Sequence, residues 1–258
     1  MTRKGEKKKG RKRKKKKERI WGTPKKRGKF FTFFKGLLRI FTRKPKIINL
    51  NDKIEDRAIY LSNHSGSSGP FTLEMFFPKY FVPWGTYEMC GGYRDRWKYL
   101  YHVYLRQKKK VPAFFAFIAA TVAACFTGMF YKGLQLVATY PDNRMLSTLR
   151  YTHRLLDEGR GILIFPENSS DGYKAVLEEF FAGFVLLAKT YFKHRGVDLP
   201  VYTVYWDKKA NTMVIDKPEY CNALLKSGKT AKQVAEFFKD KANALRSAFI
   251  LKETAMPA

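Results

Sequence analysis

A histidine stands in a turn rich in glycine and serine, directly after a run of apolar residues. His64 follows Asn63 and precedes residues 65–70, which read Ser-Gly-Ser-Ser-Gly-Pro. A neutral imidazole at the carboxyl end of a strand can take a proton from an attacking hydroxyl or amine. The turn does not match the Gly-x-Ser-x-Gly pattern of serine hydrolases, so a serine nucleophile is disfavoured. The pattern predicts a general base at His64, with a ring that only caps the turn as the alternative.

A second polar turn follows another apolar run, residues 161–165. Pro166 stops this run as a strand, and five polar side chains come after it. The carboxyl ends of parallel strands meet at one edge of a sheet, so we expect these side chains to face the same edge as His64. There they could form hydrogen bonds with a polyol or a lipid headgroup. A capped connection between a strand and a helix is the alternative. The five residues are Glu167, Asn168, Ser169, Ser170 and Asp171.

The elements that must position these turns alternate along the chain. Apolar runs predict strands at residues 58–62, 134–139, 161–165, 201–206 and 212–216. Amphipathic spacing predicts helices at residues 143–158, at 174–194 and after Thr230. Strands that alternate with helices indicate an α/β fold with a mostly parallel central sheet flanked by helices.

The charge is concentrated near the N-terminus. The chain of 258 residues has a net charge of +29, and residues 1–28 alone contain sixteen Lys and Arg against two Glu. Residues 7–17 contain no apolar residue to bury, so residues 1–28 are predicted to be a disordered polybasic tail. An anionic membrane surface is the partner that we favour; nucleic acid and a solvated tail with no specific partner are the alternatives.

Two segments have the composition of membrane-contacting helices. Residues 29–53 interleave phenylalanine and leucine with lysine and arginine, which predicts an amphipathic segment at a lipid surface. Residues 111–131 carry no charge and are long enough to span a bilayer, although a half-inserted or buried helix has the same composition. We expect residues 54–258 to form the folded domain, at the cytoplasmic face of the cell membrane, peripheral or with one partly inserted segment.

The cysteines are too widely separated to form a recognisable site. Cys90, Cys125 and Cys221 share no close spacing, so neither a disulfide framework nor a cysteine-rich zinc site is predicted. We expect no metal and no cofactor.

Taken in order, the two turns and their surroundings resemble the motifs of the glycerolipid acyltransferase superfamily, which includes glycerol-3-phosphate and lysophosphatidic acid acyltransferases. Asn63 and His64 match the first motif, and residues 165–167, Phe-Pro-Glu, match the third. Residues 157–164 resemble the lead-in to the third motif, and residues 199–202 resemble the fourth. The resemblance covers about residues 54–205.

The resemblance implies acyl transfer with His64 as general base. The acyl donor would be acyl-CoA or acyl carrier protein, and the acceptor a lysophospholipid or another lipid hydroxyl. Glu167 would belong to the catalytic site, with Asn63, Arg144 and residues 168–171 around the substrate. Arg144 lies in a loose match to the second motif and is the candidate to replace the missing cation. The alternative is that it only lies in the first turn of a helix.

The chain departs from the family pattern at two places. The aspartate expected five positions after the histidine is Gly69, and the arginine of the third motif is Ser170. Glu74, Asp142 and Asp171 are the candidates to replace the aspartate. Loss of the arginine favours an acceptor without phosphate. Two other functions stay open: a catalytically inactive, lipid-binding member of the same fold, and a nucleic-acid-binding protein that acts through the basic tail.

Overall fold

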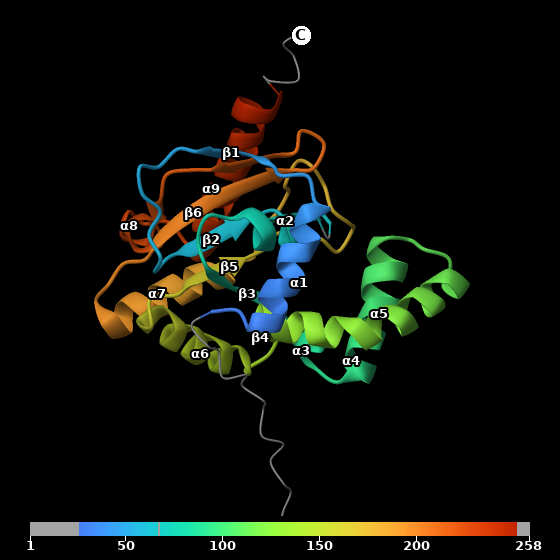
Figure 1. Ribbon diagram of the computed structural model, residues 1–258. Coiled ribbons are helices and arrows are strands. Elements are labelled where there is room, and N and C mark those ends of the chain that lie inside the picture. Colours follow the sequence, from blue (N-terminus) through green and yellow to red (C-terminus); the bar gives the residue numbers. More distant parts are fainter. Residues whose placement is uncertain (1–25, 67, 252–258) are drawn as a thin grey trace, which may run out of the picture.

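The computed structural model describes residues 26–66 and 68–251, in which helices and strands alternate (Figure 1). The strands are β1 (Lys46–Asn49), β2 (Ile59–Ser62), β3 (Phe81–Thr86), β4 (Val137–Thr139), β5 (Gly161–Ile164), β6 (Pro200–Asp207), β7 (Thr212–Ile215) and β8 (Glu219–Tyr220). The helices are α1 (Lys29–Ile40), α2 (Ser68–Phe76), α3 (Tyr87–Cys90), α4 (Tyr93–Lys98), α5 (Ala113–Leu134), α6 (Met145–Asp157), α7 (Gly183–Arg195), α8 (Cys221–Lys226) and α9 (Ala231–Leu245). Two further segments, η1 (Tyr99–Lys108) and η2 (Arg246–Leu251), are π-helical.

The strands form one mixed sheet in the order β1-β7-β6-β2-β5-β3-β4, with β8 beside β6. Strands β6, β2, β5, β3 and β4 run parallel to their neighbours, and β7 and β8 run antiparallel to β6. This arrangement confirms the predicted α/β class with a mostly parallel sheet flanked by helices. The parallel pairing of β2 with β5 brings the two polar turns to one edge.

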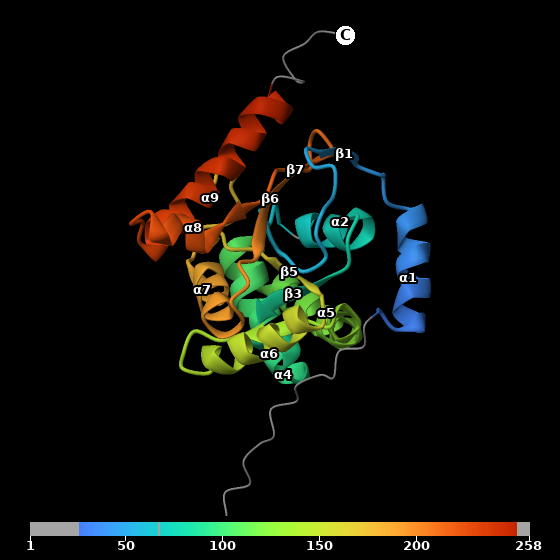
Figure 2. The same ribbon diagram turned by 90° about the vertical axis from the view of Figure 1, so that its left-hand side faces the viewer.

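The central strands are buried on both faces, as parallel strands between helices must be. All four residues of β2 are buried: Ile59 and Leu61 join the core cluster under α6, α7 and α9, and Tyr60 joins the cluster under α2. Figure 2 shows α2 and α1 on one side of the sheet and α6 to α9 on the other. Gly161 at the start of β5 lies against Tyr60, where a Cβ atom would be 2.4 Å from the ring.

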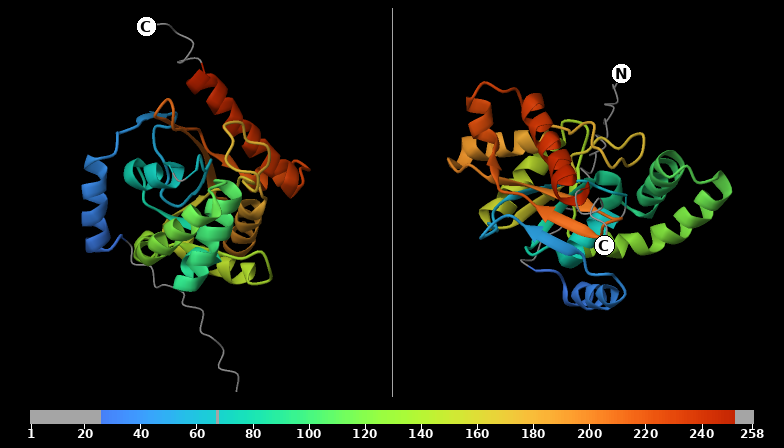
Figure 3. Two further views of the ribbon diagram at one scale, coloured as in Figure 1. Left: turned by 90° about the vertical axis from the view of Figure 1, so that its right-hand side faces the viewer. Right: turned by 90° about the horizontal axis from the view of Figure 1, so that it is seen from above.

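Helices α4 and α5 with segment η1 form an arm that projects from the side of the sheet (Figure 3). Ala116, Ala120 and Ala124 of α5 are fully buried, at the spacing of one helix face. Ala120 and Ala124 pack with aromatic residues of α4 and η1, which include Trp97 and Tyr104. Small side chains let the helices approach closely and leave the large apolar residues of α5 on the outer face.

Most of the predicted elements are present, with three differences. The helix expected at residues 174–194 begins only at Gly183, because residues 174–182 run back along the turn after β5: the amide of Phe181 donates to Pro166 and the amide of Asn168 to Glu179. The strand expected at residues 134–139 is shorter, because α5 continues to Leu134. Strands β1, β3 and β8 were not predicted.

The folded unit starts before the expected boundary at residue 54. Strand β1 pairs with β7, so residues 46–49 belong to the sheet. The end of the predicted tail is also held by the fold, because Arg27 forms an ion pair of 2.6 Å with Glu74 and donates to the carbonyl of Leu134. Residues 1–25 lie outside the described residues, and the prediction for them is untested.

Candidate functional site

The two polar turns meet at the carboxyl edge of the sheet, where β2 and β5 lie side by side. The backbone N–H of His64 donates to Oε2 of Glu167 over 2.8 Å. Glu167 is buried, and its backbone forms an antiparallel bridge with Phe180, so the residue as a whole joins three segments. Glu167 therefore holds the backbone at His64 and does not contact the imidazole through this bond.

The imidazole of His64 is held in one orientation. Its Nδ1 lies 2.5 Å from the carbonyl oxygen of Gly66, which can only accept a hydrogen bond. The ring lies 4.8 Å from that of Phe165 and is stacked at 4.9 Å on Tyr173, measured between ring centroids. The proton is thereby placed on Nδ1, and the lone pair on Nε2, as a general base requires.

The surroundings of His64 keep its ring neutral. Burial lowers its pKa to about 4, and the positive charges of Lys108 and Lys109 act in the same direction. Burial raises the pKa of Glu167, against the effects of the His64 amide and Lys108. Burial lowers the pKa of Lys108, which the charge of Glu167 partly offsets. At neutral pH His64 is thus an uncharged but weak base.

Two lysines at the end of η1 complete the site. Nζ of Lys108 donates to the hydroxyl of Ser169 over 2.7 Å, and both ammonium groups lie over the ring of Tyr173, at 5.2 Å for Lys108 and 5.9 Å for Lys109. Gln107 donates to the carbonyl of Ser170. In the sequence, residues 108–110 only precede the uncharged segment 111–131, and no motif marks Tyr173. Only the fold of the arm shows that they belong beside His64.

Gly69 leaves no space for the expected aspartate. It lies in the first turn of α2, and a Cβ atom there would be 2.3 Å from the carbonyl oxygen of His64 and 3.0 Å from that of Asn63. Real Cβ atoms do not approach backbone this closely, so any side chain would force the turn to move. The glycine is required by the path of the chain at this turn.

The candidate replacements for the aspartate are engaged or directed elsewhere. Glu74 is buried on α2 and binds Arg27 and Lys35. Asp142 pairs with Arg144 at 2.7 Å. Asp171 is exposed on the loop after β5, where its charge acts on Lys174. The group that orients the His64 ring is the backbone carbonyl of Gly66.

Of the other predicted site residues, some lie beside His64 and others lie away from it. Asn168 and Ser170 form a local turn in which Oδ1 of Asn168 accepts from the amide of Ser170, and this turn carries Ser169 to Lys108. Asn63 is buried, and both ends of its amide bond to the backbone of Trp206, so it joins β2 to β6 rather than facing a substrate. Arg144 follows β4 at the far end of the edge, paired with Asp142 and stacked on aromatic rings.

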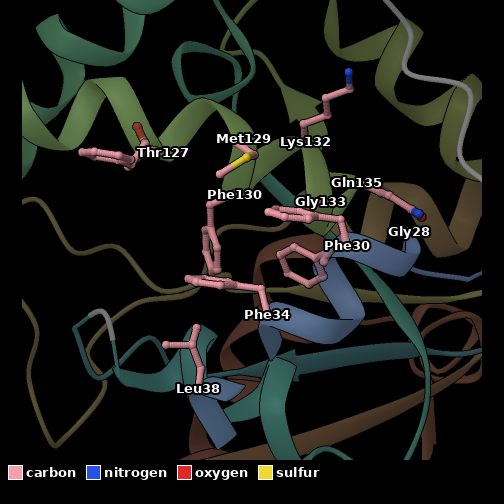
Figure 4. Close-up of a pocket in the computed structure, with 12 residues that line it drawn as sticks. Gly28, Phe30, Phe34, Leu38, Thr127, Met129, Phe130, Lys132, Gly133 and Gln135 are labelled. Atoms are coloured by element: carbon pink, nitrogen blue, oxygen red, sulfur yellow. The ribbon is translucent and has the colours of Figure 1, made fainter. Parts of the chain in front are cut away.

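A broad apolar surface lies on α1 and the outer face of α5. The exposed side chains are Phe30, Phe33, Phe34, Leu37, Ile40 and Phe41 near α1 and Phe114, Phe115, Phe117, Ile118, Val122, Phe126 and Met129 on α5. Between the helices runs a groove of about 830 Å³, lined by Phe31, Phe34, Leu38, Met129 and Phe130 among others (Figure 4). Within the described residues, α5 is the one helix long and apolar enough to cross a membrane.

Among residues 26–66 and 68–251, the structure contains no group of three or more His, Cys, Asp or Glu side chains placed to hold a metal ion. Comparison with the models of known protein families gives no match. A search of curated proteins gives no significant match either.

Proposed function

We propose that this protein is an acyltransferase that works at a membrane surface and moves an acyl chain from acyl-CoA or acyl carrier protein to a hydroxyl group of a lysophospholipid or other lipid acceptor. The observation that carries this proposal is the state of His64 at the carboxyl edge of the sheet. Its Nδ1 proton is committed to Gly66, which leaves Nε2 as the proton acceptor. The order of motifs along the sequence supports the same reaction.

The proposed step needs one base and no other covalent participant. Nε2 of His64 takes the proton of the acceptor hydroxyl while the hydroxyl oxygen bonds to the carbonyl carbon of the thioester. The resulting tetrahedral intermediate collapses with cleavage of the carbon–sulfur bond. The imidazolium then returns its proton to the leaving thiolate, so the products are an ester and a free thiol. Glu167 is a positioning residue, because it fixes the backbone of His64.

The apolar surface on α1 and α5 supports work at a lipid surface. Phe33 and Ile40 are 73% and 77% exposed, and Phe114 on α5 is 70% exposed. Contiguous apolar patches of this kind are rare on soluble monomers and mark interaction sites. The basic residues on α1 and the turn before α5 add attraction to anionic headgroups. We propose that this surface lies in the headgroup region of a bilayer, peripheral at the cytoplasmic face.

An inactive, lipid-binding protein of the same fold is the second candidate. One observation favours it: the partner of Nδ1 is a neutral carbonyl, so nothing at that position stabilises the imidazolium that a base must form. In a protease triad, loss of the equivalent charge costs about 10⁴ in rate. This candidate predicts lipid binding without acyl transfer.

Transfer of labelled acyl groups tests the proposal. The full chain is incubated with acyl-CoA or acyl carrier protein as donor and with vesicles that contain a total lipid extract, and the product is identified by mass. We expect a labelled lipid with wild type and its loss with His64→Ala. His194→Ala is the matched control, because this histidine is exposed at the end of α7 and should leave transfer unchanged. No product with either donor, from a folded protein that still binds vesicles, would contradict transfer and favour the inactive candidate.

A further inference from the structure

The most unusual feature of the site is its pair of uncompensated lysines. Within the described residues, neither Lys108 nor Lys109 forms a salt bridge with a carboxylate, although both lie beside buried groups. The nearest acid in electrostatic terms is Glu167, whose Oε2 is already bonded to the His64 amide. Burial disfavours the charged form of Lys108. The nearness of the second ammonium group acts in the same direction, and a bound anion would offset both effects.

The backbone holds the two lysines in place. Segment η1 ends in a tight turn in which the amide of Lys109 donates to Tyr104 and that of Val111 donates to Leu105. Lys110 has φ +54°, in the left-handed region that residues with a side chain seldom adopt. Such conformations persist where the surroundings enforce them, often at functional sites. The turn is tied to the site by the bond from Lys108 to Ser169.

The two lysines lie close to the turn that holds His64. Nζ of Lys109 lies over Gly66, 3.4 Å from where a Cβ atom would be, so the absence of a side chain there keeps the approach open. Lys108 uses one of its three N–H donors on Ser169, which leaves two for a ligand. The ring of Tyr173 contacts both ammonium groups and is stacked on the ring of His64, so the two lysines and the histidine meet at one aromatic side chain.

We propose that Lys108 and Lys109, with the hydroxyl of Ser169, bind a phosphate group beside His64. Two ammonium groups and a hydroxyl match the charge and the acceptor oxygens of a phosphate monoester, which carries nearly two negative charges at neutral pH. The phosphate belongs either to the headgroup of the acceptor lipid or to the coenzyme A of the donor. The two lysines would thus supply the positive charge of the arginine that Ser170 replaces, although they lie far from Ser170 in the sequence.

The bound phosphate activates His64. Lys108 and Lys109 both oppose protonation of the ring, together with its burial. A dianion between them cancels their repulsion, so the pKa of His64 rises toward its ordinary value and the ring becomes a better base. The other groups that face the ring are Tyr173, which is neutral at neutral pH, and Glu167. Substrate binding and base strength are therefore coupled, which makes His64 weak until a phosphate arrives.

The test follows the titration of His64 by NMR in the full chain, with its signal assigned by comparison with His64→Ala. Inorganic phosphate is the first probe. We expect the midpoint to rise from about 4 when phosphate is added. In the double variant Lys108→Gln/Lys109→Gln, we expect phosphate binding to weaken by at least about tenfold and the midpoint without phosphate to lie higher than in wild type.

Lys110→Gly is the matched control. It removes a neighbouring positive charge at a position whose backbone favours glycine, so the turn is kept. Binding and the midpoint should stay as in wild type. If phosphate leaves the His64 titration unchanged in wild type, or if the double variant binds phosphate as well as wild type does, the proposal is overturned.

Two further probes distinguish the source of the phosphate. Lysophosphatidate in detergent micelles and coenzyme A are added separately, with lysophosphatidylcholine and dephospho-coenzyme A as their respective controls. A rise in the midpoint with lysophosphatidate alone assigns the site to the acceptor, and a rise with coenzyme A alone assigns it to the donor. This inference rests on the proposed function only for the role of the phosphate in transfer. Absence of acyl transfer with an intact phosphate response would contradict the proposed function and leave the phosphate site standing.

Discussion

The ring of His64 is oriented by the carbonyl oxygen of Gly66, which lies 2.5 Å from Nδ1. The carbonyl fixes the tautomer as a carboxylate would, but it brings no negative charge to balance an imidazolium. Because Gly66 has φ +71°, the chain can turn back sharply enough for its carbonyl to reach the ring two residues earlier. The site therefore has the geometry of a general base without its usual electrostatic support.

The lowered pKa of His64 makes the stability of the fold depend on pH. A histidine in the unfolded chain has a pKa of about 6.5, so between pH 6.5 and 4 the unfolded state binds the proton that the folded state excludes. The free energy of unfolding should fall as the pH drops through this window, by up to about 3 kcal/mol, with no further contribution from His64 below pH 4. Urea denaturation at pH 7 and pH 4.5 measures this difference.

His64→Gln is the comparison for that experiment. Glutamine cannot take up the proton, so the part of the pH dependence due to His64 should disappear. Other groups contribute equally to both proteins, and only the difference between them counts. An identical pH dependence of wild type and His64→Gln would show that the ring is not held neutral.

Restoring the aspartate of the family pattern should harm the protein. Gly69→Asp puts a side chain 2.3 Å from the carbonyl oxygen of His64, so the turn must move. We expect a loss of about 1–3 kcal/mol in the free energy of unfolding, and no gain in acyl transfer. Gly36→Ala is the control, because this helical glycine has open space around it and alanine should stabilise α1 by about 0.5–1 kcal/mol. Faster transfer by Gly69→Asp would show that the turn tolerates the carboxylate.

The sequence predicted the scaffold of the site because its signals are local. The apolar run before His64 and the run before Pro166 are short, fully buried and followed by polar turns, and such runs become neighbouring parallel strands. Strand β3 was missed because Pro83 interrupts its pattern, although it pairs on both sides in the sheet.

The chemistry around the ring could not be predicted in the same way, because it depends on long-range packing. Lys108 is far from His64 in the sequence, and it reaches Ser169 because the end of η1 lies against the loop after β5. The predicted helix over residues 174–194 would have placed Tyr173 at a helix start. Instead, the backbone hydrogen bond from Phe181 to Pro166 keeps the segment as a loop, and in this loop the ring of Tyr173 stacks on that of His64.

Glu74 should matter for stability and for the docking of α1, not for the chemistry of His64. Its carboxylate is 3% exposed and binds both Arg27 and Lys35. Glu74→Leu leaves the nearly buried guanidinium of Arg27 unpaired, and we expect a loss of about 3–5 kcal/mol in the free energy of unfolding. Glu236→Leu removes an acid that is mostly exposed on α9 and should change stability little. Unaltered stability of Glu74→Leu would contradict a structural role for this ion pair.

A second variant, Glu74→Gln, tests whether Glu74 acts on the site. The His64 titration should be the same in Glu74→Gln as in wild type, because the charges that act on the ring are those of Lys108 and Lys109. A lowered midpoint in Glu74→Gln would instead identify Glu74 as the carboxylate that replaces the missing aspartate.

The apolar surface should control membrane binding without holding the fold together. Phe33 and Phe114 are 73% and 70% exposed, so Phe33→Ser with Phe114→Ser removes little buried area and should leave thermal stability nearly unchanged. We expect binding to vesicles with anionic lipid to weaken by about tenfold or more, measured by co-sedimentation. Leu146→Ser on α6 is the control, because Leu146 is 57% exposed on another surface. Equal loss of binding in the control would contradict a defined contact surface.

Helix α5 should lie along the membrane surface and not cross the bilayer. Its 22 residues span about 33 Å, enough to cross, but both of its ends are attached to the same domain. Lys108, five residues before the helix, is bonded to the site loop, and only Gln135 and Leu136 separate the end of the helix from β4. A crossing helix would have to place these attachments on opposite sides of a hydrocarbon layer about 30 Å thick. Its buried alanine face would also have to leave η1. Alkaline carbonate should therefore release the protein from membranes, as it does peripheral proteins, whereas retention in the membrane pellet beside an integral marker would mean that the arm opens and α5 inserts.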